Sequence, residues 1–452
     1  MQLLDGFFRS PAVEPFFSPA ATIQAILDFE AALARAEARA GILSEAAATA
    51  ITSCCRSNLF NLQVLEQAMP SAGNLAIPLL KQLTAMVARV SPEASQYVHH
   101  GATSQDALDT GLVLQIRSAT RAVLGDLDHL IAALAALAST HRRSVMVART
   151  WLQHALPTTF GFVAAGWLDA CLEHRERLHS LIERSLVVEF GGAVGTLAAL
   201  RDRGAQIAAL LAEELALPLP RIPWHSERER IAEIAAAYGL LSATLRKIAR
   251  DLSLHMQTEV AELSEPADTG RGGSSTMPHK QNPVACAAVL AATSRVPPLV
   301  GSIFSAVSGE YQRSLGPWQS EWETLPEIVR LTAGALHQLA ALLPVLTVHS
   351  DKMRANVELT HGLIYAEAVT LALSGKLNRA SAHKLVEAAC RRARSERQNL
   401  HDILAADTEV TAILDPQSLA QLFESGNYLG SADVFIDAVL AAGAYVKTTA
   451  EG

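Results

Sequence analysis

The feature that most constrains the fold of this chain is the stretch from Gln105 to His141, which contains no proline. Apolar residues recur in it at steps of three and four, which places them on one face of a helix. If unbroken, such a helix would be on the order of 50 Å long, and helices of that length are typical of bundles. The apolar positions are Leu112, Ile116, Ala119, Val123, Leu127, Leu130, Leu134 and Leu137.

Two other stretches predict helices of the same kind. One covers residues 226–263, where Ser226 and Glu229 form a capping-box pattern and neither a proline nor a glycine pair interrupts the sequence. The other follows Pro283 and should be broken at the proline pair 297–298. The middle of the chain is therefore expected to be a bundle of long helices.

Strand signals are scarce, and the short candidate is Val187–Phe190. The glycine-rich segment 191–195 lacks the spacing of a dinucleotide-binding turn and predicts a loop. The predicted fold class is all-α, with a long central helical bundle flanked by smaller helical N- and C-terminal domains. We place these domains at residues 1–110, 111–360 and 361–452.

Composition excludes several classes of protein. The 452 residues are 50% hydrophobic and 18% charged, which is enough apolar material for a large core. A formal net charge of -8 argues against nucleic acid or an anionic membrane as a general partner. The five cysteines show neither metal-ligand spacing nor a disulfide framework, which favours a reducing, cytoplasmic setting. We expect no secretion and no membrane span, because no apolar stretch approaches the roughly 20 residues that a bilayer requires.

The strongest chemical signal is the Gly/Ser loop Gly272–Pro283, in which a Lys and an Asn follow the glycines. Glycine allows backbone geometries closed to other residues, so the loop can fold over an anionic substrate. Ser274 and Ser275 offer hydroxyls, while Lys280 and Asn282 offer the charge and the donors that a carboxylate enolate requires. The pattern indicates proton transfer next to a carboxylate. The alternative is an ordinary surface loop before a helix.

A second cluster, His100–Asp106, lies just ahead of the first long helix. Helix N-termini favour anions, so Thr103 or Ser104 can cap the helix while exposed amides and hydroxyls bind a carboxylate. His100 adds a donor or a titrating group. The alternative is a capped helix with a hydrogen-bonded histidine.

A third cluster gathers Arg149, Thr150, Trp151, Gln153 and His154 where a helix stops and restarts. It combines a cation, a hydroxyl, an amide and an imidazole beside a large aromatic ring. These groups are suited to a polar binding pocket, and the alternative is a loop capped by Thr and Pro.

Other polar residues give weaker signals. His225 and Arg228 are possible site residues, although a solvated helix start explains them about as well. We expect His99, His141 and the pair 142–143 to lie on the surface.

Taken together, the clusters at 100–106, 149–154 and 273–283 resemble, in this order, the three blocks of the fumarase/aspartase superfamily. That superfamily includes class II fumarase, aspartase, argininosuccinate lyase and adenylosuccinate lyase, and the resemblance covers nearly the whole chain. It implies a homotetramer with one shared helical core, in which three subunits build each active site. It implies a small carboxylate substrate and neither a metal nor an organic cofactor.

The resemblance also implies roles for individual residues. Ser274 matches the base that takes the proton next to a carboxylate, and Lys280 and Asn282 match the residues that hold the dianionic intermediate. Thr103 and Ser104 match substrate-carboxylate ligands. Residues that fall where the second block lines the pocket are Thr150, Gln153 and His154.

The chain departs from the adenylosuccinate-type lyases at two matched positions. It has Trp151 where they have the general-acid His, and Ala287 where they have the Glu that orients this His. A leaving group that needs no proton explains the double loss, because a carboxylate with a pKa of about 4 can depart unprotonated. Lactone opening releases such a group.

The segment after the third block differs as well. Trp318 and Trp322 stand where those lyases have a Ser/His-rich phosphate-binding segment, while Arg313 is a candidate ligand for a substrate carboxylate. A lyase of the adenylosuccinate or argininosuccinate type remains the nearest alternative. A non-catalytic structural protein on the same scaffold is the alternative from another class.

Overall fold

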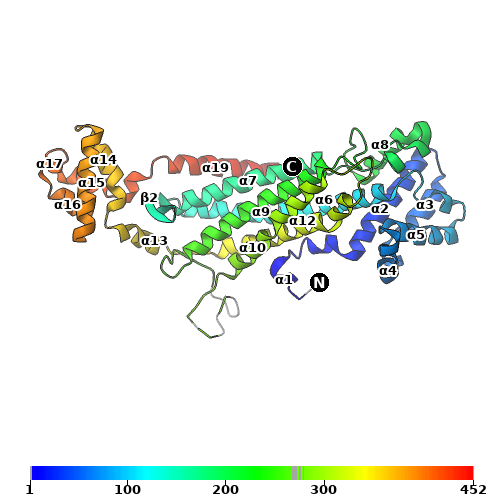
Figure 1. The fold of residues 1–452 in the computed structure, drawn as a ribbon, viewed down its shortest axis with the longest axis horizontal. Helices are drawn as coiled ribbons and strands as arrows, with labels where there is room; N and C mark the ends of the chain where they lie inside the picture. Colours follow the sequence, from blue (N-terminus) through cyan, green and yellow to red (C-terminus); the bar gives the residue numbers. More distant parts are fainter. Residues whose placement is uncertain (1–2, 267–271, 274–275, 278, 451–452) are drawn as a thin grey trace. The chain divides into compact units, whose positions relative to one another are not determined.

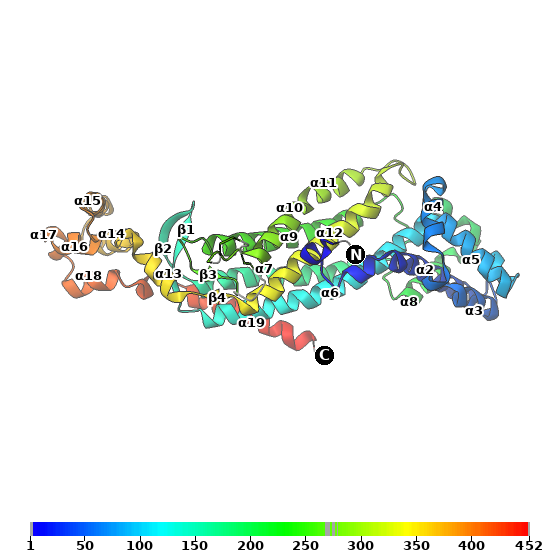
Figure 2. The same cartoon turned by 90° about the horizontal axis from the view of Figure 1, so that it is seen from below.

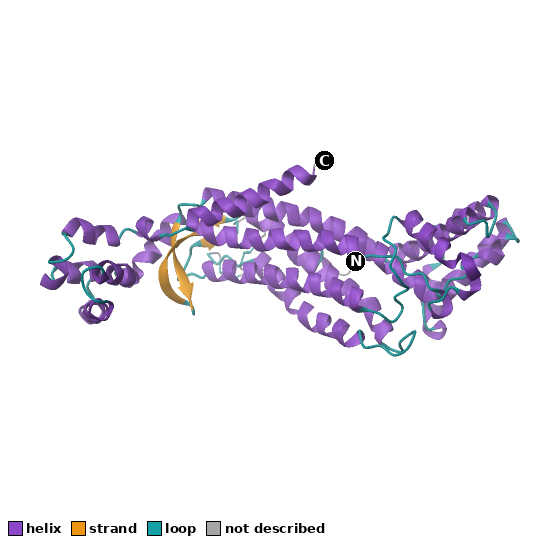
Figure 3. Cartoon of the chain, turned by 90° about the horizontal axis from the view of Figure 1, so that it is seen from above, coloured by secondary structure: helices purple, strands orange, loops and turns teal. Residues whose placement is uncertain are grey.

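The computed structural model describes residues 3–266, 272–273, 276–277 and 279–450, with residues 444–450 by their backbone alone. Over these residues helices form most of the regular structure, together with two small two-stranded sheets (Figure 3). The predicted all-α class is confirmed.

The chain forms two compact units. Unit 1 comprises Met1–Asp128, Glu173–Lys247 and Ala287–Leu339, and unit 2 comprises His129–Leu172, Ile248–Cys286 and Ala340–Gly452. The division into domains at 110 and 360 stays a prediction.

In unit 1, helix α2 (Pro19–Arg39) packs against α3 (Glu45–Cys54) and α8 (Gly204–Leu215) (Figure 1). The sequence sets the start of α2, because the Ser18 side chain accepts a hydrogen bond from the Ala21 amide and Pro19 occupies the first turn. The other helices of this unit are α1 (Asp5–Phe8), α4 (Leu62–Ala72), α5 (Ala76–Val90) and α11 (Val296–Ala306).

The long helices contribute residues to both units. The first is α6 (Ser104–Thr140), which confirms the helix predicted over Gln105–His141. Six of its eight predicted apolar positions are fully buried, and Leu112 and Leu137 are partly buried. The others are α7 (Phe160–Arg184), α9 (Glu229–His255), α10 (Val284–Ser294) and α12 (Pro317–Leu342).

The predictions for the later helices need one correction. Helix α9 begins at Glu229 and ends at His255, not at residue 263, and the buried Ser226 hydroxyl has no hydrogen-bond partner. The capping box is therefore wrong, because the helix starts too late for Ser226 to reach its first amides. The predicted break at the proline pair 297–298 is confirmed, since α10 ends at Ser294 and α11 begins at Val296.

The strand prediction was also wrong. Residues 187–190 form no strand, whereas β1 (Val145–Thr150) and β2 (Gln153–Thr159) pair as an antiparallel hairpin. The third cluster therefore lies on a hairpin and not on a simple loop. The sequence hides it because the two-residue turn contains Trp and Leu in place of Asn and Gly.

The remainder of unit 2 is mostly short helices. A second sheet pairs β3 (Leu263–Ser264) with β4 (Thr347–Val348). Helices α14, α15, α16 and α18 share one apolar core, and they cluster together in Figure 2. The helices of this part are α13 (Ser350–Val357), α14 (Ala366–Ser374), α15 (Arg379–Glu396), α16 (Leu400–Ala405), α17 (Thr408–Thr411), α18 (Pro416–Leu422) and α19 (Ala432–Ala450).

Three helical stretches are long and apolar enough, by length and composition, to cross a membrane: Ser104–Thr140, Val284–Ala306 and Pro317–Val345. The expectation that no stretch reaches this length was therefore wrong. Only 39% of the apolar window in Val284–Ala306 is buried within the chain. Most of this apolar window is thus not buried within the chain.

Candidate functional site

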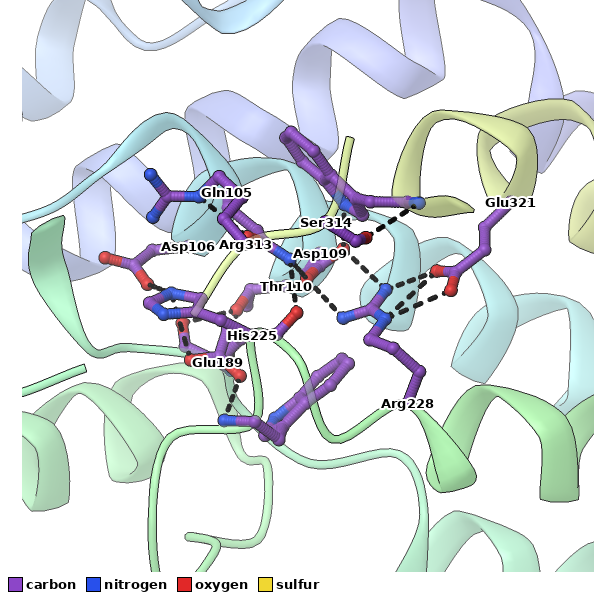
Figure 4. Close-up of polar contacts among 12 residues, drawn as sticks. Gln105, Asp106, Asp109, Thr110, Glu189, His225, Arg228, Arg313, Ser314 and Glu321 are labelled. Carbon is purple, nitrogen blue, oxygen red and sulfur yellow. Dashed lines mark hydrogen bonds and ion pairs between the residues drawn. The ribbon is translucent and has the colours of Figure 1, made fainter. Parts of the chain in front are cut away.

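The first block, residues 100–106, is held in place by the carboxylate of its own Asp106. Asp106 Oδ2 accepts hydrogen bonds from the amides of Thr103 at 2.8 Å and Gly192 at 3.0 Å. Its Oδ1 accepts from the Gly191 amide at 3.0 Å and lies 2.6 Å from His225 Nε2 (Figure 4). The Thr103 amide, expected to face a substrate carboxylate, is therefore already engaged.

Gly192 is required at this junction. Its φ is +68°, and a Cβ there would lie 2.8 Å from the Gly101 carbonyl oxygen. Gly191 and Gly192 thus do not bind a dinucleotide but bring two amides to Asp106. The loop 191–195 supports the block that precedes α6.

Glu189 lies beside this contact and is fully buried. Its Oε2 accepts the Trp224 amide at 2.7 Å, and its Oε1 has no hydrogen-bond partner and lies 3.3 Å from His225 Nε2. Burial, and next the charges of Asp106 and Asp109, raise the pKa of Glu189 well above its ordinary value. The buried Glu189 carboxyl, which accepts the Trp224 amide, is therefore a structural group.

Asp106, Glu189 and His225 are also the described residues that come nearest to a metal site, with ligand atoms within 4.8 Å of one another. Both oxygens of Asp106 accept backbone amides, and one of them also faces His225. A cation would have to displace these bonds. These three side chains are therefore better suited to a hydrogen-bonded structural cluster than to a metal site.

The second support is the buried guanidinium of Arg228. Asp109 accepts from its Nη1 at 2.6 Å and from its Nη2 at 3.1 Å, while Glu321 accepts from Nε at 3.1 Å. Trp318 Nε1 donates to Asp109 at 3.0 Å. A solvated helix start, which was the alternative to a site role for His225 and Arg228, is wrong, because both residues are buried among fixed partners.

Arg313 is exposed and connects to the same network. Its Nε donates to Gln105 Oε1 at 2.9 Å and its Nη2 to the Ala193 carbonyl at 3.2 Å. Gln105 in turn donates to Asp109 at 3.0 Å. The exposed guanidinium thus lies beside the start of α6, where Ser104 is the first helical residue.

Two histidines ahead of α6 face buried acids. His100 Nδ1 lies 2.8 Å from Glu37, and His99 Nδ1 lies 2.6 Å from Glu30, so the surface position expected for His99 is wrong. Burial, and next the charge of Glu30, raise the pKa of Glu37 to about 8. Glu37 therefore keeps its proton at neutral pH and can share it with His100.

In unit 2 the second block forms the tip of the β1–β2 hairpin. Thr150 pairs with Gln153, so Trp151 and Leu152 alone make the turn. Both have positive φ, 54° and 62°, and both are exposed, Trp151 by 95%. A left-handed backbone is costly for such side chains. A large aromatic residue is thus held in solvent on a strained turn.

The base of this hairpin is fixed by Glu262, which is fully buried. Its oxygens accept from Arg149 Nη1 and Nη2 at 3.0 and 2.7 Å, and from Asn356 Nδ2 at 2.8 Å. His255 Nδ1 lies 2.6 Å from it. Burial opposes ionisation, but hydrogen bonds from His255, Arg149 and Asn356 outweigh it and lower the pKa of Glu262 to about 2. Arg149 is therefore bound internally.

His154 is opposite Arg149 in the hairpin. Burial, and next the charge of Arg149, lower the pKa of His154 below its ordinary value. Its buried Nδ1 has no hydrogen-bond partner. The lowered pKa of His154 therefore favours the neutral form of its imidazole.

The third block is closed at its base in the same unit. The Gly272 carbonyl accepts from Asn282 N at 2.9 Å and Nδ2 at 3.1 Å, and Gly273 bridges to Gln281. Lys280 is exposed. Ser274 and Ser275, the predicted base and its neighbour, lie outside the described residues.

Glu265 fixes the helix that follows this loop. Its Oε1 and Oε2 accept the Ala285 amide at 3.1 and 3.2 Å, and Oε1 also accepts the Cys286 amide at 3.2 Å. These amides belong to the first turn of α10, whose dipole favours an anion there. Ala287, the next residue of α10, is exposed.

Sequence patterns missed the supporting acids, namely Glu37, Asp109, Glu189, Glu262, Glu265 and Glu321. Each was a single carboxylate far along the chain from its partner, so no local spacing revealed it.

Comparisons with known proteins confirm the resemblance to the fumarase/aspartase superfamily. A family described as lyase matches residues 11–297, and one described as adenylosuccinate lyase C-terminus matches residues 362–439. The chain therefore belongs to the lyase family of the fumarase/aspartase superfamily.

Individual relatives are similar over the full length. The 3-carboxy-cis,cis-muconate cycloisomerases of Bradyrhizobium diazoefficiens and Pseudomonas aeruginosa are each 49% identical, covering 95% and 97% of this chain and 98% and 96% of theirs. The crystal structure of 3-carboxy-cis,cis-muconate lactonizing enzyme from Pseudomonas putida has a TM-score of 0.93 at 45% identity, covering 98% of this chain and 99% of that one. A fumarate lyase from Mesorhizobium has a TM-score of 0.88 at 39% identity, covering 96% and 98%.

Proposed function

We propose that this protein is a cycloisomerase that converts 3-carboxy-cis,cis-muconate to 4-carboxymuconolactone, in the protocatechuate branch of the β-ketoadipate pathway. The observation that carries the proposal is the full-length similarity to enzymes of that name, at 49% identity. One substrate carboxylate adds across the neighbouring double bond and closes the lactone. The enolate left on the adjacent acetate arm then takes up a proton.

The roles of the site residues are part of the proposal. Ser274 returns the proton to the enolate, while Lys280 and Asn282 stabilise its negative charge. Asn282 already donates to the Gly272 carbonyl, and its amide has a second N–H for the intermediate. Lys280 is exposed and thus available.

Other residues bind the carboxylates that do not react. Thr103 and Ser104 contribute hydroxyls, with His100 and Arg313 beside them in unit 1. In unit 2 the pocket is lined by Thr150, Trp151, Gln153, His154 and Ser275. Arg149 acts through Glu262 by holding the hairpin.

Neither Trp151 nor His154 is suited to donate a proton to a leaving group. This supports lactone chemistry over the nearest alternative. A lyase of the adenylosuccinate or argininosuccinate type expels an amine, which must take up a proton. Trp151 has no acidic proton to give, and burial and Arg149 lower the pKa of His154, which favours its neutral form. A cycloisomerase for a modified muconate would use the same groups, and a non-catalytic protein would need none of them.

The protein is proposed to be a cytoplasmic homotetramer with each active site built by three subunits. The apolar surface left on Val284–Ala306 supports association, because apolar helical faces of this size are normally covered. The exposed Trp151 supports it as well. Light scattering on the purified protein tests the tetramer.

Activity is tested by mixing the purified protein with 3-carboxy-cis,cis-muconate and following the loss of diene absorbance. We expect turnover, and we expect no cleavage of adenylosuccinate or argininosuccinate. Cleavage of either compound without muconate turnover would reject the proposal. Turnover close to wild type in Ser274→Ala, with an intact helical signal, would remove Ser274 from its role as base.

A further inference from the structure

Gln105, the second residue of α6, is buried and uses its whole side-chain amide in hydrogen bonds to its neighbours. Its Nε2 donates to the Asp109 carboxylate at 3.0 Å and to the His225 carbonyl at 2.9 Å, and its Oε1 accepts from Arg313 Nε at 2.9 Å (Figure 4). A carboxylate and a carbonyl accept hydrogen bonds but do not donate them, so the amide nitrogen must face these two groups. The amide oxygen is thereby turned toward Arg313.

The partners that orient Gln105 are themselves fixed. Asp109 also accepts from Arg228 Nη1 at 2.6 Å and from Trp318 Nε1 at 3.0 Å. Asp109, Arg228 and Trp318 are all buried. The orientation of Gln105 is therefore set inside the protein and does not depend on a group in solvent.

Arg313 uses one edge of its guanidinium for internal contacts. Nε donates to Gln105, and Nη2 donates to the Ala193 carbonyl at 3.2 Å. These two N–H groups lie on the same edge of the planar group, so Nη1 and the second N–H of Nη2 form the adjacent edge. Nη1 has no hydrogen bond to the residues that the structure describes, and the side chain is exposed. A fork of two parallel donors is thus left free, and this fork matches a carboxylate.

The same fork is occupied in the two other arginines of the supporting networks. Arg149 donates through Nη1 and Nη2 to Glu262, and Arg228 donates through Nη1 and Nη2 to Asp109. Both of these forks face buried acids. The described partners of Arg313 are instead an amide oxygen and a backbone carbonyl, which orient the cation without neutralising its charge.

The substrate of the proposed function has one carboxylate that suits such a fixed cation. In 3-carboxy-cis,cis-muconate one carboxylate closes the lactone, and a second lies next to the enolate. The carboxylate on C3 forms and breaks no bond, so it carries its full charge from substrate to product.

We propose that Gln105 is a positioning residue, which holds the free fork of Arg313 on the C3 carboxylate and so makes the site select 3-carboxy-cis,cis-muconate over cis,cis-muconate. The proposal rests on the proposed function, in which Arg313 is a ligand of an unreacting carboxylate. Loss of a contact that is equal in the substrate and in the transition state raises KM and leaves kcat unchanged.

The test is a double-substitution cycle with 3-carboxy-cis,cis-muconate as the substrate. Arg313→Ala should raise KM at least about tenfold and change kcat less than about threefold. Gln105→Met keeps the length of the side chain but removes the amide, and it should raise KM about three- to tenfold. Because Gln105 acts through Arg313, adding Gln105→Met to Arg313→Ala should change KM less than about twofold. Independent effects that multiply in the double variant would overturn the proposal.

Selectivity is measured with cis,cis-muconate as a competing ligand, since it lacks only the carboxylate on C3. Its inhibition constant should change less than about threefold in Arg313→Ala, because the lost fork has no partner on this compound. An equal rise for both compounds would show that Arg313 binds a different carboxylate, and it would overturn the proposal.

Gln24→Met is the matched control, because Gln24 also donates to an acid and to a backbone carbonyl, those of Asp28 at 2.8 Å and Cys55 at 3.1 Å. It should keep the KM of the wild type, and circular dichroism checks the folding of each variant. Arg313→Lys keeps the charge but not the fork, so it should raise KM at least about fivefold even where Gln105→Met does not fold. A wild-type KM in Arg313→Lys would overturn this inference alone. Absence of muconate turnover by the wild type would reject the proposed function, and with it this inference.

Discussion

The first and second blocks are both held by buried polar side chains, but they differ in how much of each block is buried. At the start of α6 the ion-paired side chains of Asp106, Asp109, Arg228 and Glu321 are buried, and Figure 4 shows their contacts. In the β1–β2 hairpin only the base is buried, through Glu262, and the tip carries Trp151 into solvent on a left-handed turn. The first region is a buried polar core with the exposed Arg313 beside it. The second is a rigid base that presents one strained, exposed tip.

This difference separates residues that hold the blocks in place from residues that we propose to touch the substrate. Buried ion pairs contribute little net stability against apolar replacements, but removing one partner is strongly destabilising. A strained tip behaves in the opposite way, because relieving it should stabilise the fold. The two regions are therefore expected to respond to substitution with opposite signs.

The largest expected effect is at Arg228. Arg228→Met leaves the carboxylates of Asp109 and Glu321 buried without their cation, and we expect the free energy of unfolding to fall by about 3–5 kcal/mol. Denaturant unfolding followed by circular dichroism measures it. The matched control is Arg391→Met, which breaks an exposed pair with Glu387 and should cost about 0.5 kcal/mol or less. Similar effects of the two substitutions would contradict a structural role for the buried network.

Glu262 should give an intermediate effect that depends on pH. Its pKa is about 2 in the folded chain, below the ordinary value of 4.5. A carboxyl group whose pKa is lower in the folded chain than in the unfolded chain stabilises the fold at pH values above its unfolded pKa. This stability is lost as the pH falls from about 4.5 toward 2. Glu262→Gln should lower the free energy of unfolding by about 1–3 kcal/mol at neutral pH, and it should flatten this acid-induced loss. Glu66→Gln, at an exposed position, is the control and should keep the slope of the wild type.

The long helices could be predicted because their signal is local. The repeat of apolar residues over Gln105–His141 predicted the bounds of α6 to within one residue at each end. Likewise the proline pair at 297–298 marked the start of α11 correctly. The capping box at Ser226 failed because a side-chain pattern does not show where the backbone turns into a helix.

The sequence could predict the three blocks of the candidate site, but it could not predict the contacts that their residues make. Sequence motifs identified Thr103, Arg149 and Lys280, yet they did not show that Asp106 takes the Thr103 amide or that Glu262 takes Arg149. Glu262 lies more than a hundred residues from Arg149, so only the fold brings them together. The hairpin was missed for a related reason, because its Trp–Leu turn contradicts local turn preferences.

The smallest energetic effect, and the sharpest test of the comparison, is at the hairpin tip. Trp151 and Leu152 both occupy the left-handed region, where a side chain costs about 1–2 kcal/mol and where Asn and Gly are preferred. Leu152→Gly should therefore raise the free energy of unfolding by about 0.5–1 kcal/mol while keeping Trp151. Adding Trp151→Asn should keep this gain but lower muconate turnover at least tenfold, because the proposed pocket loses its aromatic wall. Turnover that survives the double substitution would show that the strained tip serves no catalytic purpose. A loss of stability in Leu152→Gly would show that the turn is held by contacts that outweigh its strain.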